Sequence, residues 1–122
     1  YIRHLVEPIS VIAEASTTRP EIYKEVEETM MFMLDFPSGA KAACQPSFGI
    51  NMNYLQVNYE KGWLKLEPQS SYNGNKGSMS DEDCMAIMNG TDLIAPGEEG
   101  LRDIKVLEAI YKSVATGKKV TI

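Results

Sequence analysis

Residues 28–36, with the sequence ETMMFMLDF, decide the fold. If this stretch is extended, side chains two positions apart share a face, because successive side chains of a β-strand point to opposite sides. One face then carries Met30, Phe32, Leu34 and Phe36. The stretch therefore predicts a strand with a continuous apolar face that needs a covering layer.

The segments around this strand also predict strands. The run ISVIAEAST, residues 9–17, is rich in β-branched residues, and a turn at Pro37, Ser38 and Gly39 leads from residues 28–36 into AKAACQPSF, residues 40–48. Further strands are expected over residues 51–59 and 63–67, joined by a tight turn that ends at Gly62. The middle of the chain is therefore predicted to be an antiparallel meander, in which Leu55, Val57 and Tyr59, and Leu64 and Leu66, extend the apolar face.

The most regular helical pattern lies near the C-terminus, in residues 95–118. Glu98 and Glu99 in its first turn favour the positive end of a helix dipole, and Gly117 is a typical helix stop. The apolar stripe that should face the sheet comprises Leu101, Ile104, Leu107 or Glu108, and Tyr111, widened by Val106, Ile110 and Val114.

Two further helices complete the expected architecture. YIRHLV, residues 1–6, is typical of the last turns of a helix, and residues 81–90 predict a short one. Together these elements predict an α+β fold, a predominantly antiparallel open β-sheet with helices packed on one face and the other face available for oligomerisation. The 122 residues are expected to form a single domain.

The second face of the sheet is unusual for a face exposed to water. It is expected to carry large side chains mixed with the polar residues Gln56, Asn58 and Lys65: Met31, Met33, Met52, Tyr54 and Trp63. A Met-rich, aromatic and partly polar face indicates a covered surface, whether by a second subunit, another domain or a ligand. A homodimer or higher homo-oligomer is the favoured expectation, and a half-exposed sheet with scattered apolar residues is the alternative.

Composition excludes several other classes. The net charge is −5 and Lys and Arg are scattered, so no basic patch for nucleic acid is expected. No apolar run approaches the roughly 18 residues of a membrane span, and a cytoplasmic location is expected. Cys44 and Cys84 lack metal-binding spacing, and His4 is the one possible nitrogen ligand, so two free thiols and no metal site are predicted.

Three segments together resemble a known family. VEETMMFMLDFPSGAKAACQPSF, VNYEKGWLKLEP and APGEEGLRDIKVLEAIYKSVATGKKV are similar, in this order, to the C-terminal domain of the glucose-fructose oxidoreductase and inositol dehydrogenase family, Gfo/Idh/MocA. The resemblance covers nearly the whole chain. It implies the C-terminal α+β domain, residues 1–122, of a two-domain oxidoreductase that acts on a sugar, polyol or related hydroxyl substrate.

The resemblance also implies which functions this chain lacks. NAD or NADP is implied for the full-length parent, but the glycine-rich fingerprint and the catalytic lysine motif belong to an N-terminal Rossmann domain that nothing here matches. No catalytic and no cofactor-binding residue is therefore expected in the chain, and His4 is not the family's catalytic histidine. Members of the family also commonly have a longer segment at the position where Ser80 is followed directly by Asp81 in this chain.

By the same resemblance, QPSFGINMNY, residues 45–54, approaches the substrate cleft. The side chains best suited to hydroxyl hydrogen bonds and to packing on a sugar are Gln45, Ser47, Phe48 and Asn51. A plain strand end followed by a turn is the alternative interpretation of these residues. For the whole chain, the alternative functions are a stand-alone dimerisation module and a small-molecule-binding module without catalytic activity.

Overall fold

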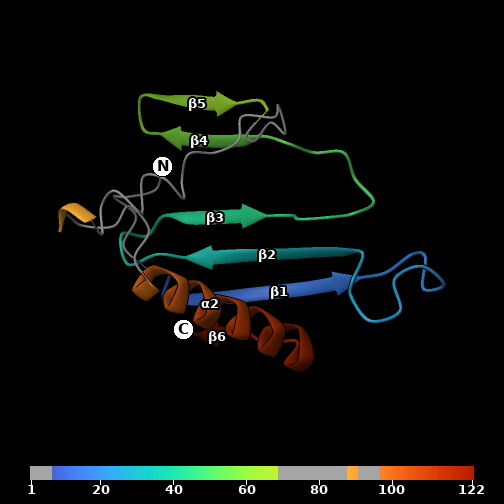
Figure 1. The fold of residues 1–122 in the computed structure, drawn as a ribbon. Helices are drawn as coiled ribbons and strands as arrows, with labels where there is room; N and C mark the ends of the chain where they lie inside the picture. Colours follow the sequence, from blue (N-terminus) through green and yellow to red (C-terminus); the bar gives the residue numbers. More distant parts are fainter. Residues whose placement is uncertain (1–6, 69–87, 91–96) are drawn as a thin grey trace. The chain divides into compact units, whose positions relative to one another are not determined.

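The protein was analysed as a computed structural model that describes residues 7–68, 88–90 and 97–122 (Figure 1). The chain divides into two units, one formed by residues 1–49 and 95–122 and the other by residues 50–94. The α+β class predicted from the sequence is confirmed, since one long helix accompanies open antiparallel sheets.

The first unit is built on a four-stranded sheet with the order β3-β2-β1-β6. Its strands are β1 (Ser10–Ser16), β2 (Thr29–Asp35), β3 (Lys41–Cys44) and β6 (Val120–Thr121), and neighbouring strands are antiparallel. The turn between β2 and β3 closes where Gly39, at a φ of 85°, donates its N–H to the carbonyl of Phe36. Glycine adopts this left-handed conformation without steric cost, which suits it to the turn.

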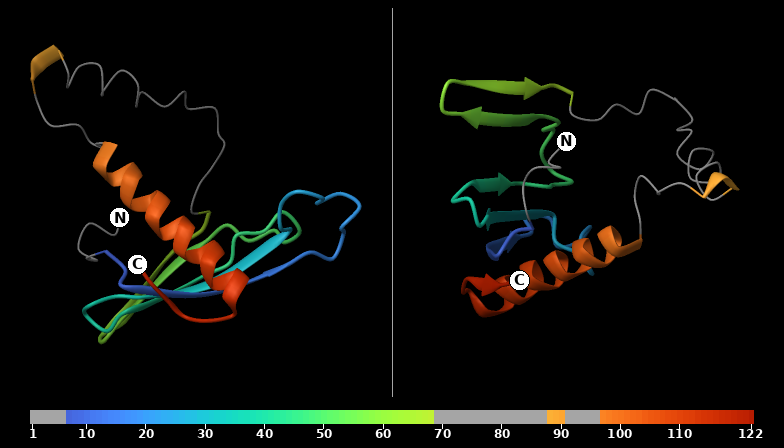
Figure 2. Two further views of the ribbon diagram at one scale, coloured as in Figure 1. Left: turned by 90° about the horizontal axis from the view of Figure 1, so that it is seen from below. Right: turned by 90° about the vertical axis from the view of Figure 1, so that its left-hand side faces the viewer.

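The first unit's helix, α2 (Gly97–Thr116), covers one face of this sheet (Figure 2). It ends where Gly117, at a φ of 63°, donates its N–H to the carbonyl of Ser113. The buried core between helix and sheet consists of Val11, Ala13, Met30, Ala109 and Ile110, with Phe32, Leu34, Val106, Val114 and Val120 packed against it. The predicted apolar row of β2 therefore faces the helix.

The buried side of α2 agrees only in part with the predicted stripe. The structure buries Ala109, Ile110 and Ser113. Roughly half of the surface remains exposed for each of Leu101, Ile104, Leu107 and Tyr111. The prediction is confirmed for Val106, Ile110 and Val114, which lie in or against the core, and wrong for the four exposed residues. Apolar residues surround most of this helix, so spacing alone did not define the contact line. Small side chains at Ala109 and Ser113 allow close approach to β1, and Ile110 fills the core beside them.

The hydroxyl of Ser113 connects three parts of the first unit. It accepts a hydrogen bond from the backbone N–H of Ala13 at 2.9 Å and donates one to the carbonyl of Lys118 at 2.7 Å. Strand β6 pairs with β1 only at Ser10 and Val11, so it does not reach the Ala13 N–H. The fully buried Ser113 therefore accepts the backbone N–H of Ala13, which the short edge strand β6 does not pair.

Two predicted strands are shorter in the structure. Strand β3 ends at Cys44, because Pro46 has no N–H with which to continue the ladder, and beyond it an isolated bridge joins Thr29 and Ser47. The strand predicted over residues 51–59 begins only at Leu55. Strand β6 was not predicted at all.

The second unit contains a hairpin of β4 (Leu55–Tyr59) and β5 (Gly62–Leu66). The predicted antiparallel hairpins β2–β3 and β4–β5 are confirmed. The meander does not continue from β3 to β4, because β4 and β5 form a sheet of their own. Their expected apolar row is only partly buried: Leu55, Val57 and Leu66 are half-buried, while Tyr59 and Leu64 are exposed.

Several predictions fall outside the described residues. These are the helix end at residues 1–6 with His4, the Ser80–Asp81 junction, Cys84 and nearly all of the helix at residues 81–90. Across the described ranges, no helix combines the length and the apolar composition that crossing a bilayer requires.

Replacing Ser113 with alanine should destabilise the protein. The substitution leaves the buried N–H of Ala13 and the carbonyl of Lys118 without their partner, which costs about 1–3 kcal/mol of the free energy of unfolding. Urea denaturation of wild type and variant would measure this change in the free energy of unfolding. Thr116→Ala is the matched control, because the exposed Thr116 hydroxyl bonds only within its own helix; its effect should stay within about 0.5 kcal/mol. Equal effects of the two substitutions would contradict this role of Ser113.

Candidate functional site

The four predicted substrate residues do not form one described cluster. Gln45, Ser47 and Phe48 follow β3 in the first unit, whereas Asn51 belongs to the second unit. Gln45 and Asn51 are exposed, Ser47 is half-buried, and Phe48 retains 75% of its accessible surface. The three residues of the first unit therefore share one environment, the segment that is hydrogen-bonded to the start of β2.

Ser47 is engaged within the protein. Its hydroxyl lies 2.7 Å from the hydroxyl of Thr29 and 3.3 Å from the carbonyl of Glu28, and it accepts the N–H of Gly49 at 3.0 Å. The hydroxyl thus holds the segment after β3 against the start of β2. This network favours an anchoring role over direct contact with a ligand hydroxyl.

Backbone hydrogen bonds hold the same segment on both sides of Ser47. The N–H of Phe48 donates to the carbonyl of Glu28 at 2.9 Å, and the N–H of Met30 donates to the carbonyl of Pro46 at 3.0 Å. The exposed side chain of Phe48 is therefore carried by a backbone that is fixed to the start of β2.

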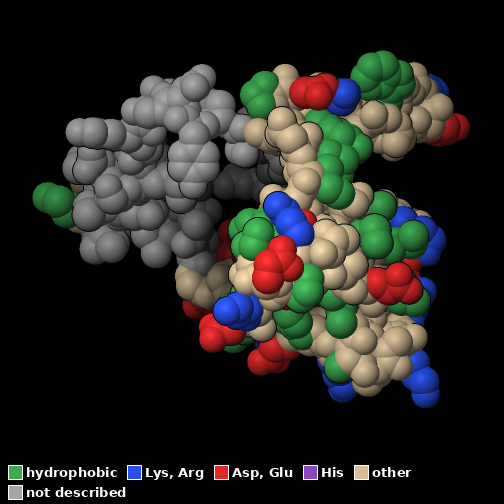
Figure 3. Space-filling view, turned by 90° about the vertical axis from the view of Figure 1, so that its right-hand side faces the viewer, with side chains coloured by type: hydrophobic (Ala, Val, Ile, Leu, Met, Phe, Trp, Pro, Cys, Tyr) green, Lys and Arg blue, Asp and Glu red, His purple; other side chains and the backbone are tan. Residues whose placement is uncertain are grey.

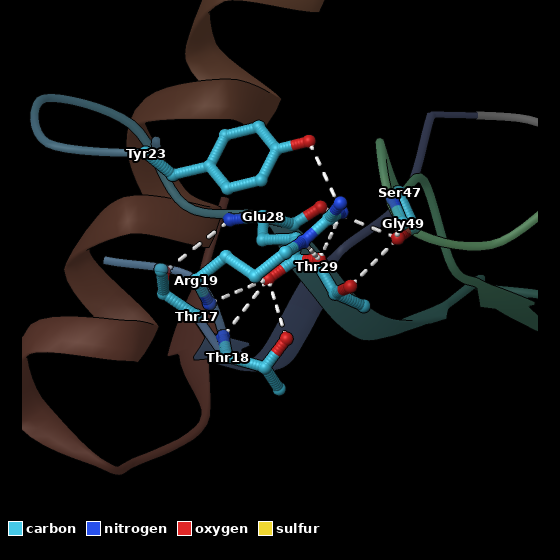
Figure 4. Close-up of polar contacts among 8 residues, drawn as sticks. All are labelled: Thr17, Thr18, Arg19, Tyr23, Glu28, Thr29, Ser47 and Gly49. Atoms are coloured by element: carbon cyan, nitrogen blue, oxygen red, sulfur yellow. Dashed lines mark hydrogen bonds and ion pairs between the residues drawn. The ribbon is translucent and has the colours of Figure 1, made fainter. Parts of the chain in front are cut away.

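At the centre of this region lies the carboxylate of Glu28, which is only 5% exposed (Figure 4). Oε2 accepts hydrogen bonds from the N–H and hydroxyl of Thr18, at 2.9 and 2.7 Å, and from the N–H of Arg19 at 3.2 Å. Oε1 accepts Nε of Arg19 at 2.9 Å and also its Nη2. A buried charge is tolerated because it is paired and fully hydrogen-bonded.

These contacts shift both partners toward their charged forms. Hydrogen bonds from Thr18, followed by those from Arg19, lower the pKa of Glu28 from 4.5 to about 2. The hydrogen bond to Glu28 raises the pKa of Arg19. Sequence reasoning missed this pair, since residues nine positions apart in a polar connection give no periodic signal.

Close approach to Glu28 also explains the glycine at position 49. A Cβ on Gly49 would lie 2.5 Å from Oε1 of Glu28 and 3.2 Å from Nη2 of Arg19. Real Cβ atoms do not come so near to a buried carboxylate oxygen. The backbone after Phe48 can therefore pass over the ion pair only with glycine at this position.

Two aromatic rings meet beside the ion pair. Nη2 of Arg19 lies 3.3 Å from the hydroxyl oxygen of Tyr23, and the guanidinium carbon lies 5.2 Å from the centre of the Tyr23 ring. The rings of Tyr23 and Phe48 are stacked, with centroids 5.7 Å apart and planes 20° apart. On the side of the molecule that carries the connection from β1 to β2, the described acidic, basic and hydrophobic side chains are intermixed (Figure 3).

The five residues predicted for an oligomer interface are divided between the two units. Met31 and Met33 lie on the face of the first sheet opposite α2, and both are more than 40% exposed. Met52 and Tyr54 precede β4, and Trp63 lies on β5. All three are exposed, and Nζ of Lys65 lies 4.9 Å from the centre of the Tyr54 ring.

Cys44 and the acidic residues give no sign of a metal centre in the described ranges. No three His, Cys, Asp or Glu side chains come together there in a suitable group. Cys44 is a free thiol, and its burial raises its pKa. This residue is therefore less reactive than an exposed cysteine.

Neutralising Glu28 should change the pH dependence of stability. A carboxyl with a lowered folded-state pKa stabilises the protein above its unfolded pKa, and this contribution is lost as pH falls through the folded value. Stability should therefore decline between about pH 4.5 and pH 2. Glu28→Gln should unfold at lower urea concentration near neutral pH and show a flatter decline in this range.

A second carboxyl, Asp35, also has a lowered pKa, caused first by Lys119 and then by Lys41. Because Asp35 is present in both wild type and Glu28→Gln, the difference between their pH profiles reports the contribution of Glu28. Glu21→Gln, in the same connection, is the matched control and should have a smaller effect. Parallel curves for wild type and Glu28→Gln from pH 2 to pH 7 would contradict the assignment.

Comparison with solved structures gives a match at 33% identity. No model of a protein family matches the chain. The structure is similar to the aldose-aldose oxidoreductase of Caulobacter crescentus, solved with glycerol, with 33% identity and a TM-score of 0.86. This match covers 95% of the present chain and 42% of that protein's chain.

Two other solved structures share the fold at 16% identity. One is an oxidoreductase of Agrobacterium radiobacter in complex with NAD+, L-tartaric acid and magnesium, with a TM-score of 0.70 over 96% of this chain and 44% of its own. The other is a proposed myo-inositol dehydrogenase of Sinorhizobium meliloti, with a TM-score of 0.63 over 95% of this chain and 44% of its own. The chain thus spans less than half of each of these three solved chains. The resemblance to the Gfo/Idh/MocA family predicted from the sequence is therefore confirmed, because the solved structures that this chain matches over nearly its whole length are oxidoreductases of that type.

Proposed function

We propose that the chain is the C-terminal α+β domain of a two-domain, NAD(P)-dependent oxidoreductase that acts on a sugar, polyol or related hydroxyl substrate. The match to the aldose-aldose oxidoreductase carries this proposal, since 33% identity extends over 95% of the chain. The proteins matched are more than twice as long, which leaves room for an N-terminal Rossmann domain in the parent. A cytoplasmic location stays a prediction.

The described residues do not fit a dinucleotide. Pyrophosphate binds where a glycine-rich loop opens a helix, so that backbone N–H groups and the helix dipole meet the negative charge. In this chain α2 begins with Glu98 and Glu99 in its first turn, and carboxylates there repel a phosphate. The described strands are paired antiparallel, without the parallel β-α-β unit of a Rossmann fold. We therefore place the nicotinamide cofactor on the proposed N-terminal domain.

The segment after β3 is the part of this domain that we propose approaches the substrate. Phe48 is the strongest candidate, because its exposed ring stands on a backbone fixed by Glu28. Ser47 supports that backbone, as its hydroxyl is bonded to the start of β2. Gln45 and Asn51 stay predictions, with exposed amides that suit hydroxyl groups.

The proposed function predicts a difference between the 122-residue chain and the longer enzyme. Calorimetric titration of the chain with NAD(H) or NADP(H) should give no saturable binding. The longer enzyme should reduce NAD+ or NADP+ when it is given an aldose or cyclic polyol, and the absorbance of the reduced nicotinamide measures this reaction. Phe48→Ala in that enzyme should raise KM or lower turnover. Saturable micromolar binding by the chain alone, or a longer enzyme without dehydrogenase activity, would reject the proposal.

The open sheet face supports a second proposal, self-association with another copy of the chain. Ile12, Met31 and Met33 lie together on this face and are 42–43% exposed. The register places Glu14 at one end of this apolar row. At the other end, Asp35 is paired with both Lys41 and Lys119, which leaves a net positive charge. A two-fold rotation would bring the acidic end of one copy to the basic end of the other.

Self-association through this face should be sensitive to one charge at its centre. Met33→Glu should shift a dimer toward monomer, because a carboxylate would be buried between apolar rows. Light scattering on a sizing column measures the molar mass and so distinguishes dimer from monomer. Met88→Glu, at a described position that is 79% exposed, is the matched control. A wild-type monomer at high micromolar concentration, or a dimer that Met33→Glu leaves unchanged, would exclude this surface. Participation of Met52, Tyr54 and Trp63 stays a prediction.

A further inference from the structure

The stacked rings of Tyr23 and Phe48 come from two segments that are far apart in the sequence. Tyr23 lies in the connection from β1 to β2, and Phe48 follows β3. Tyr23 is half-buried, while Phe48 remains 75% exposed. Stacking covers one side of the Phe48 ring, so the remaining exposure leaves an apolar surface open to solvent.

Glu28 fixes both rings through different atoms. Its carboxylate holds the guanidinium of Arg19, which in turn contacts the ring and hydroxyl of Tyr23. Its backbone carbonyl accepts the N–H of Phe48. Because Glu28 is buried and all of these contacts converge on it, the two rings are held in place before any ligand arrives. Such preorganisation lowers the entropy that binding would otherwise cost.

We infer that Tyr23 is a specificity-determining residue of the substrate surface, and that the Tyr23–Phe48 pair binds the C–H face of a sugar or cyclic polyol ring. This inference rests on the proposed function. Phe48 supplies an apolar face without hydrogen-bonding groups, which suits ring C–H groups. The partly exposed guanidinium of Arg19 supplies donors for hydroxyl groups, since within the described part of the chain its Nη1 makes no hydrogen bond.

The surroundings favour a neutral ligand over a phosphorylated one. The same connection carries Glu21, Glu25 and Glu27 beside Tyr23, against a single additional cation, Lys24. These carboxylates oppose the approach of a phosphate and leave the hydroxyl groups of a neutral ring unaffected. A nucleotide that stacks through its base would therefore be a poorer occupant than a neutral sugar.

The test is an NMR titration of the 122-residue chain with D-glucose and with myo-inositol. The ring-proton shifts of Tyr23 and Phe48 are followed, with NAD+ as the planar, anionic comparison. At least one of the two neutral probes should shift both rings in a saturable manner. No shift at either ring, or a larger response to NAD+, would overturn the inference.

Variants separate the role of the stack from that of Phe48 alone. Tyr23→Leu should raise the dissociation constant of the responding probe by roughly threefold to tenfold, because the substitution removes an aromatic pair. Tyr23→Phe keeps the ring and should stay close to wild type, which also controls for misfolding. Tyr59→Leu removes a tyrosine that is 66% exposed on β4 and should have no effect.

Unchanged affinity in Tyr23→Leu would overturn the inference while leaving the proposed function intact. Loss of dehydrogenase activity in the longer enzyme is a separate observation, because the titration requires neither a cofactor nor turnover. The two proposals can therefore fail independently.

Discussion

The hydroxyl of Ser113 is the contact on which the first unit depends. Strand β6 is only two residues long, so the N–H of Ala13 on the buried edge of β1 needs an acceptor from elsewhere. A serine can supply it only if the helix lies close to the sheet, and the small side chain of Ala109 allows this approach. The same hydroxyl ties down Lys118, from which the chain returns into β6. One hydrogen-bonding requirement thus fixes the rotation of α2.

The carboxylate of Glu28 has the corresponding role at the candidate site. It neutralises Arg19 and satisfies the backbone of Thr18, which closes the connection between β1 and β2. Its neighbour Gly49 lets the chain after β3 pass over the pair. Phe48 is therefore exposed on a backbone that cannot move freely. An exposed apolar ring on such a rigid support is a feature of binding surfaces, since the support reduces the ordering cost of binding.

Sequence reasoning succeeded where the signal was local. Alternation in β1 and β2 and the glycines at the ends of turns were sufficient for these elements, because each depends on residues only a few positions apart. It failed where distant residues decided the outcome. Strand β6 exists because it meets the edge of β1, and the buried side of α2 is set by Ser113 reaching Ala13. The Arg19–Glu28 pair, which organises the candidate site, has no periodic pattern for the same reason.

The ionisable groups with shifted pKa values bear on the proposed division of roles within the longer enzyme. General acid–base catalysis works best when the pKa of the catalytic group lies near the working pH. Among the described residues with shifted values, hydrogen bonds lower the pKa of Glu28 and Asp35, while those of Cys44, Tyr111 and Arg19 are raised. Every one of these shifts moves the group further from neutral pH. Such groups hold a fixed charge or none near neutral pH, which agrees with the proposal that this chain helps to position a substrate while proton and hydride transfer take place on another domain.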